Sequence, residues 1–216
     1  MSFLTNAVFS MSVGIAAIIG WIRIKKTDLA YLPFVLLMGA GFVNELTSFA
    51  LVSKGYSNSS SFNLYSLTAA LLLGWQFYRW GLFRSKQIYF LLQTLFISGW
   101  LAELYFTRKE HLFVSYFIIG YSFIIVFLSI EQINREIFPL KRKLYLHPGF
   151  LICMGLLIFY TYSVMVEAFW IYGLNKSSFF RIRIYEILAY INLFTNLLFA
   201  FALLWIPLKT QYILRY

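Results

Sequence analysis

Long apolar runs separated by short polar segments dominate the sequence. No charged residue occurs between Met1 and Ile22, and comparable runs recur along the rest of the chain. A helix that crosses the hydrocarbon core of a bilayer needs about 20 mostly apolar residues. The pattern therefore predicts an all-α, polytopic bundle of seven transmembrane helices forming one domain over residues 1–216. The expected helices cover residues 3–22, 30–52, 62–82, 87–107, 112–130, 149–171 and 184–206.

The ends of these runs carry polar or helix-breaking residues. The first run is followed, not preceded, by the basic residues Arg23, Lys25 and Lys26, the reverse of the order in a cleaved signal peptide, so it is expected to remain as a helix. Pro33 falls in the first turn of the second helix, where a proline is tolerated. The longest connection is expected between Glu131 and His147.

Composition supports lipid as the solvent of this chain. Hydrophobic residues make up 61% of the sequence, aromatic residues 21% and charged residues only 12%, whereas about a quarter of a soluble domain is charged. The mean hydropathy is +0.76. A water-soluble fold of 216 residues has too little interior to hide this much apolar surface. We expect a multi-pass protein of the bacterial inner membrane.

The net charge of +10 has a different meaning in a membrane protein than in a soluble one. Lys and Arg lie almost wholly between the apolar runs, where such residues fix orientation and contact anionic headgroups. We therefore expect the lipid bilayer as a partner and no nucleic acid. A protein partner at the basic face and a homo-oligomer are both compatible with the sequence.

Orientation follows from the distribution of these basic residues, because short cytoplasmic loops are enriched in Lys and Arg. Twelve lie on one side and six on the other, which predicts an outside N-terminus and a cytoplasmic C-terminus. The twelve are Arg23, Lys25, Lys26, Arg79, Arg84, Lys86, Arg135, Lys141, Arg142, Lys143, Lys209 and Arg215. The six are Lys54, Arg108, Lys109, Lys176, Arg181 and Arg183.

Four glutamates fall within or at the ends of the predicted helices. With about 1.5 Å of rise per residue, Glu45 lies roughly 6 Å from the middle of its helix, and Glu103 and Glu167 roughly 9 to 10 Å from theirs. Glu186 is close to the outer interface. All four displacements point outward in the predicted orientation. Ionisable groups inside a membrane are costly and indicate functional sites.

Small and polar residues share faces with these carboxylates, and such faces turn toward other helices. We expect an outward-opening polar cavity that binds a ligand or a cation. The alternative for Glu45 and Glu167 is a structural hydrogen bond between helices, and for the pairs Arg183–Glu186 and Glu103–Arg108 it is interfacial ion pairing. The candidate binding residues are Glu45, Glu167, Asn44, Asn63, Asn192 and Asn196.

Other polar residues predict packing and anchoring. Ser115, Ser122 and Ser129 recur every seven residues, which favours a close helix contact. Gln76 and Arg79 are expected to reach the headgroups from a helix end. His111 and His147 both lie in connections, so the three-histidine zinc site of membrane hydrolases is not predicted. We expect no cofactor, no metal site and no catalytic constellation.

Three short motifs carry a resemblance to a known group. They are Leu32–Pro33–Phe34 with Asn44–Glu45, then Asn63–Leu64–Tyr65, and then His147–Pro148–Gly149–Phe150. With these the chain resembles small seven-helix membrane proteins of Bacteroidetes-type bacteria, some of which stand alone and some of which precede sensor kinases. The resemblance implies the fold and the membrane location.

Three functions are compatible with the sequence. The first is a sensor or regulatory module that binds a ligand or cation in the outer cavity and acts through a partner. The second is a transporter or an oligomeric ion-conducting pore, as in membrane effectors of defence systems. The third is a lipid-modifying enzyme with paired carboxylates in acid–base roles.

Overall fold

A turn at Met11 and Ser12 divides the first apolar run into two helices. The computed structural model describes residues 3–107, 113–137, 147–172 and 178–207. Within them, α1 spans Phe3–Ser10 and α2 spans Val13–Arg23. The Gly14 N–H donates to Met11 O at 2.9 Å and the Ile15 N–H to Ser12 O at 3.0 Å. These are the shorter-range bonds of a tightened turn, so the continuous helix expected over residues 3–22 is wrong.

The remaining helices follow the predicted order with shifted ends. The short 3₁₀ helix η1 (Leu29–Tyr31) leads into α3 (Leu32–Ser53), and α4 (Ser59–Arg79) and α5 (Lys86–Thr107) follow. Next come α6 (Ser115–Ile137), α7 (Pro148–Ile171) and α8 (Ser178–Trp205). The all-α class is confirmed for the described residues. The helix α8 begins six residues before its predicted start at residue 184.

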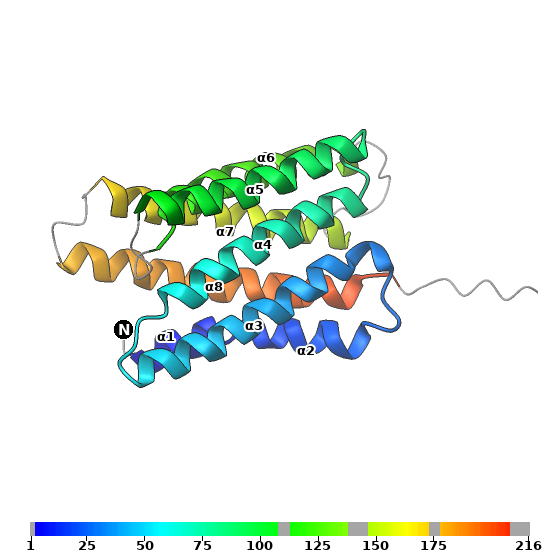
Figure 1. Cartoon of the computed structure of the whole chain (residues 1–216). Coiled ribbons are helices and arrows are strands. Elements are labelled where there is room, and N and C mark those ends of the chain that lie inside the picture. Colours follow the sequence, from blue (N-terminus) through cyan, green and yellow to red (C-terminus); the bar gives the residue numbers. More distant parts are fainter. Residues whose placement is uncertain (1–2, 108–112, 138–146, 173–177, 208–216) are drawn as a thin grey trace, which may run out of the picture.

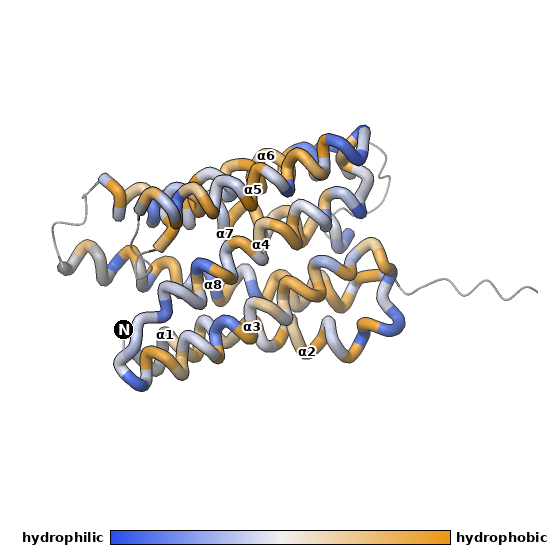
Figure 2. Tube along the Cα trace, viewed as in Figure 1, coloured by the Kyte–Doolittle hydropathy of each residue, from blue (hydrophilic) through white to orange (hydrophobic). Residues whose placement is uncertain are grey.

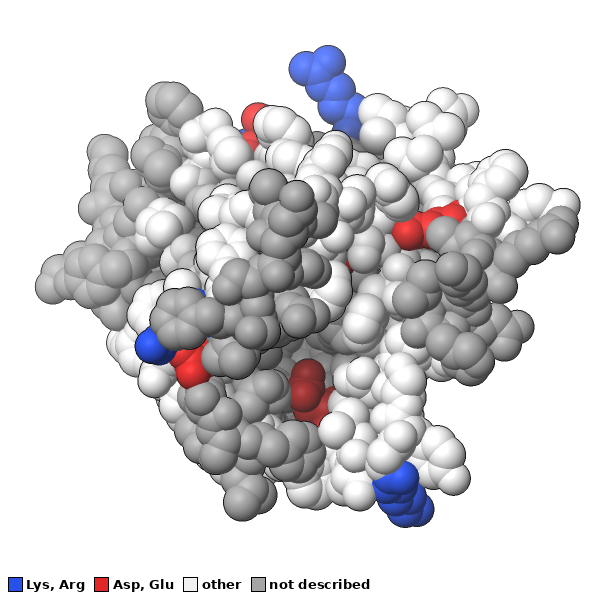
Figure 3. Space-filling view, turned by 90° about the vertical axis from the view of Figure 1, so that its left-hand side faces the viewer, with Lys and Arg blue, Asp and Glu red and all other residues white. Residues whose placement is uncertain are grey.

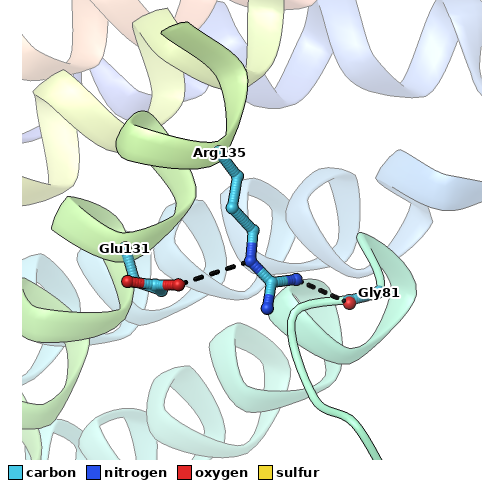
Figure 4. A network of polar contacts seen from close by, with 3 residues as sticks. All are labelled: Gly81, Glu131 and Arg135. Carbon is cyan, nitrogen blue, oxygen red and sulfur yellow. Dashed lines mark hydrogen bonds and ion pairs between the residues drawn. The ribbon is translucent and has the colours of Figure 1, made fainter. Parts of the chain in front are cut away.

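The helix α6 continues past the residues that were expected to begin the longest connection. Glu131 and Arg135 lie on its last turns, where Arg135 Nε is 3.4 Å from Glu131 Oε1. Arg135 Nη1 also donates to Gly81 O at 3.0 Å, which links α6 to the turn between α4 and α5 (Figure 4). Gly81 has a φ of +74°, a conformation that glycine adopts without a steric cost.

The helices form a ring in which successive neighbours pack together. The helix α2 contacts α3, the chain continues around the ring through α4, α5, α6, α7 and α8, and α8 returns to α2. A direct contact between α4 and α6 leaves α5 on the outside of the ring. Figure 1 shows the long helices lying side by side along one axis. The most extensive contact joins α6 to α7, where Ser122 and Ser129 are fully buried.

Hydrophobic residues predominate along the helices (Figure 2), and many large apolar side chains are exposed on the outside of the bundle. Ile22, Leu91 and Phe106 are 75%, 71% and 80% exposed, a surface that would associate in water. Five helices among the described residues are long and apolar enough to cross a membrane, and they lie within α3 with η1, α5, α6, α7 and α8. These features make the chain an all-α membrane protein.

One half of the ring interior is filled by packed side chains. Phe34, Phe77 and Leu203 are no more than 2% exposed there. Gln76 is fully buried, so the expectation that it reaches the headgroups is wrong. Its Oε1 accepts the Phe34 N–H at 2.9 Å, and its Nε2 donates to Ala30 O at 2.6 Å. An N–H in the first turn of α3 that has no helical partner is thereby satisfied.

Arg23 closes the same end of the bundle. Its Nη1 donates to Leu203 O at 2.9 Å and to Leu204 O, and its Nη2 donates to Ile206 O at 3.2 Å. The last carbonyls of a helix lack intrahelical partners and attract a cation. Arg23 therefore caps α8 and holds it against α2.

Candidate functional site

A pocket opens inside the ring at the end opposite to Gln76 and Arg23. Its outer lobe has a volume of about 630 Å³. Three carboxylates line it from three different helices: Glu45 from α3, Glu103 from α5 and Glu167 from α7. Figure 3 looks onto this end of the bundle and shows acidic side chains, some of them set back in a hollow. The polar residues that complete the lining are Ser10, Asn44, Ser48, Asn58, Ser115 and Asn192.

A narrower inner lobe of about 150 Å³ continues from the outer one toward the packed half. Glu45, Glu167 and Asn192 line both lobes and therefore lie at their junction. Most of the inner surface is apolar, with side chains such as Leu37 and Leu156. Three tyrosines, Tyr65, Tyr121 and Tyr160, are also among its lining residues.

The two central glutamates face one cavity from opposite sides of the ring. Glu45 follows Gly41 by one turn of α3, and a Cβ at Gly41 would lie 3.3 Å from Tyr65 Oη. This close approach lets α4 bring Tyr65 beside Glu45. On α7, Glu167 follows Ser163 by one turn, and Ser115 at the start of α6 lies within reach of its carboxylate. Both carboxylates are partly buried.

Glu103 has a structural partner that sequence reasoning did not find. Its Oε1 accepts the Tyr116 N–H at 3.1 Å, and its Oε2 accepts the Phe117 N–H at 2.6 Å. These N–H groups belong to the first turn of α6, where a negative charge is favourable. The partner expected for Glu103, Arg108, lies outside the described residues.

The two candidate asparagines on the α3–α4 side have different positions. Asn44 lines the outer lobe, and its Oδ1 accepts a hydrogen bond from Ser61 Oγ at 2.8 Å. Asn63 is 3% exposed and is not part of the lining of either lobe. Its Oδ1 accepts the Val114 N–H at 3.1 Å, so Asn63 joins α4 to the chain just before α6.

The candidates on α8 lie along the pocket wall. Asn192 reaches both lobes and Asn196 reaches the inner lobe only. Asn196 Nδ2 donates to Ser12 Oγ at 3.0 Å, and Ser12 Oγ donates to Phe9 O at 2.6 Å. The turn between α1 and α2 is thereby fixed against α8, and irregular backbone within a membrane protein is tolerated where it borders a cavity.

Arg183 and Glu186 form an ion pair outside the pocket lining. Arg183 Nη1 lies 2.9 Å from Glu186 Oε2, at the start of α8. The Arg183 side chain is 61% exposed. This pair is a local contact at the helix end, where solvent screens the attraction between the two charges.

Among the described residues, the charged side chains that line the pocket are all acidic. No Lys or Arg is among the described residues that line either lobe. The described residues also contain no group of three His, Cys, Asp or Glu side chains close enough to share a metal ion. The three carboxylates line a space of about 630 Å³, which is larger than a single ion. Aromatic rings of Phe62, Phe113 and Trp170 lie among them, and such faces attract cations.

The chain matches no known family, and neither a curated protein nor a solved structure matches it. Fold and pocket therefore define its class. It is a helical membrane protein with an acidic, two-lobed pocket at one end of the bundle.

Proposed function

We propose that this protein is a multi-pass membrane sensor or regulatory module that binds an organic cation in an outward-facing pocket and acts through a partner protein. The observation that carries the proposal is the convergence of Glu45, Glu103 and Glu167 on one pocket whose described lining contains no basic side chain. A low-dielectric pocket of one charge sign concentrates ligands of the opposite sign.

The topology in this proposal has seven crossings. The segment of α1 and α2 supplies the first, and each of the six longer helices supplies one more. The helix α4, with 21 residues, is about 31 Å long and matches the hydrocarbon core of a bilayer. The N-terminus and the pocket lie outside, and the cytoplasmic end carries exposed basic residues such as Lys25, Arg84 and Lys86.

The same basic end supports contact with a protein partner. Arg79, Arg84 and Lys86 are exposed at the turn between α4 and α5. Arg135 reaches this turn from α6 through Gly81 O. A ligand that draws helices together around the pocket would change the spacing of the same helices at this end. An acidic partner surface is the chemistry that this end favours.

The packed half of the ring favours binding over conduction. Below the inner lobe, the space is occupied by fully buried side chains such as Phe34, Leu73 and Ile152. A pore would need a polar path through this region. Transport remains the second candidate from the sequence, and flux across liposomes distinguishes it from ligand sensing.

Binding of choline to the purified protein in lipid nanodiscs, measured by calorimetry, tests the proposal. We expect Glu45→Gln and Glu167→Gln each to weaken binding by about tenfold or more, because a carboxylate about 4 Å from the quaternary ammonium of choline attracts it by roughly 1–4 kcal/mol. Glu131→Gln is the matched control, since Glu131 is exposed at the other end of α6. Absence of choline binding to the wild type, or equal binding by all three variants, would overturn the proposal.

A further inference from the structure

The two lobes of the pocket differ in chemistry, and this difference indicates the kind of cation that fits. The outer lobe carries the carboxylates, whereas the inner lobe is mainly apolar. Resting on the proposed function, we infer that the ligand is an arylalkylamine. Its ammonium group lies at the junction between Glu45 and Glu167, and its ring occupies the inner lobe.

The size of the inner lobe fits one ring. Its volume is about 150 Å³, and an apolar protein cavity of about 150 Å³ binds benzene. The close packing of the surrounding side chains leaves little room to expand, because protein interiors have the density of organic crystals. A single six-membered ring therefore enters this lobe, and a fused bicyclic ring does not.

The walls of the inner lobe suit an aromatic group. Tyr121 and Tyr160 pack edge to face with ring centroids 5.5 Å apart. Phe159 and Tyr160 pack in the same way with centroids 5.2 Å apart. A ligand ring inserted beside them gains edge contacts of the kind that aromatic pairs prefer. An alkyl chain of the same volume lacks these contacts.

Asn196 supplies a polar contact at the inner lobe. The side chain is 5% exposed and lines this lobe. Its Nδ2 donates to Ser12 Oγ and to Asn192 Oδ1, at 3.0 Å and 3.4 Å. Within the described part of the chain no hydrogen bond occupies its Oδ1. A donor on the ligand ring would therefore find an available acceptor in this oxygen.

The carboxylates at the junction set the distance between the charge and the ring. Glu45 and Glu167 border both lobes, so an ammonium group held by them is immediately above the inner lobe. A linker of about two carbons between the nitrogen and the ring spans this step, since extended chain atoms advance only a little over 1 Å each. Phenethylamine has this form and is the probe of choice.

The test compares phenethylamine, ethylamine and 2-(2-naphthyl)ethylamine by calorimetry with the full chain in nanodiscs. We expect phenethylamine to bind about tenfold tighter than ethylamine or better, because a well-placed apolar group adds 10-fold or more to affinity. The naphthyl compound should gain no affinity over ethylamine. Equal affinities for ethylamine and phenethylamine, or tighter binding of the naphthyl compound than of phenethylamine, would overturn the inference.

Two variants locate the ring. Ser163 lines only the inner lobe, and its hydroxyl donates to Phe159 O within α7, so Ser163→Phe fills the lobe without removing a contact between helices. We expect it to abolish the preference for phenethylamine while choline binding persists. Ser98→Phe, on the exposed face of α5, should leave the preference unchanged. If Ser163→Phe still prefers phenethylamine over ethylamine, the inference is contradicted but the proposed function is not. If the wild type does not bind choline, the proposed function is contradicted as well.

Discussion

Glu103 Oε2 accepts the backbone N–H of Phe117 at 2.6 Å and so joins the end of α5 to the start of α6. A carboxylate in this position is stabilised by the dipole of the helix that it caps. It remains on the wall of the outer lobe at the same time. Glu103 therefore holds the pocket in shape, whereas in the proposed function Glu45 and Glu167, which line both lobes, provide the charge for the ligand.

Substitution of Glu103 should lower stability more than it lowers affinity. We expect Glu103→Ala to reduce the free energy of unfolding by about 0.5–2 kcal/mol, the usual cost of losing a side-chain cap. Thermal unfolding followed by circular dichroism in detergent measures this, with Glu131→Ala as an exposed control. An unfolding midpoint for Glu103→Ala equal to that of the control would mean that the capping bonds contribute nothing.

Gln76 should be intolerant of replacement by an apolar residue of similar size. In Gln76→Leu the buried Phe34 N–H and the partly buried Ala30 C=O lose their partner. Each unsatisfied buried group costs about 1–3 kcal/mol. The exposed Gln87→Leu on α5 is the matched control, and both are compared by the same unfolding measurement. Similar midpoints for the two variants would show that this contact does not hold α3 to α4.

Two glycine substitutions should have opposite effects. A Cβ at Gly155 would overlap the ring of Phe199, so Gly155→Ala should destabilise the α7–α8 contact by about 1–3 kcal/mol. A Cβ at Gly39 would meet nothing within 4 Å, so Gly39→Ala should stabilise α3 by about 0.5–1 kcal/mol. Unfolding midpoints that move in the same direction for both variants would contradict this packing.

The affinity gained from a hydroxyl group on the ligand ring should depend on Asn196. The free Oδ1 of this residue predicts that tyramine binds the wild type tighter than phenethylamine by roughly tenfold, the value of a hydrogen bond of about 1–1.5 kcal/mol. Asn196→Leu should remove this difference, and calorimetry with both amines measures it. If the variant keeps the same preference for tyramine, the hydroxyl contacts another group.

The lengths of the apolar runs were sufficient to place most of the helices. The turn at Met11 and Ser12 could not be predicted, because neither proline nor charge interrupts that run. The extension of α6 was not predicted, because charged residues such as Glu131 and Arg135 are typical of a connection between membrane helices. A glutamate four residues before an arginine also supports a helix end.

Less of the candidate site than of the helix pattern was predictable from the sequence. The shared level of Glu45, Glu103 and Glu167 followed from their positions within the runs. Which groups they contact did not, since the capping of α6 depends on how the helices pack. Tyr65 and Tyr121 were not predicted as pocket residues, because aromatic residues at helical spacing look the same in a core and at a ligand site.

The most direct test of cation binding compares phenethylamine with phenethyl alcohol, which has the same ring and linker but no charge. Calorimetry with the wild-type protein should give affinity for the amine at least about tenfold higher, and the double variant Glu45→Gln, Glu167→Gln should bind the two compounds alike. Equal affinity of the wild type for amine and alcohol, or an unchanged preference in the double variant, would contradict the assignment of these carboxylates to a cationic ligand.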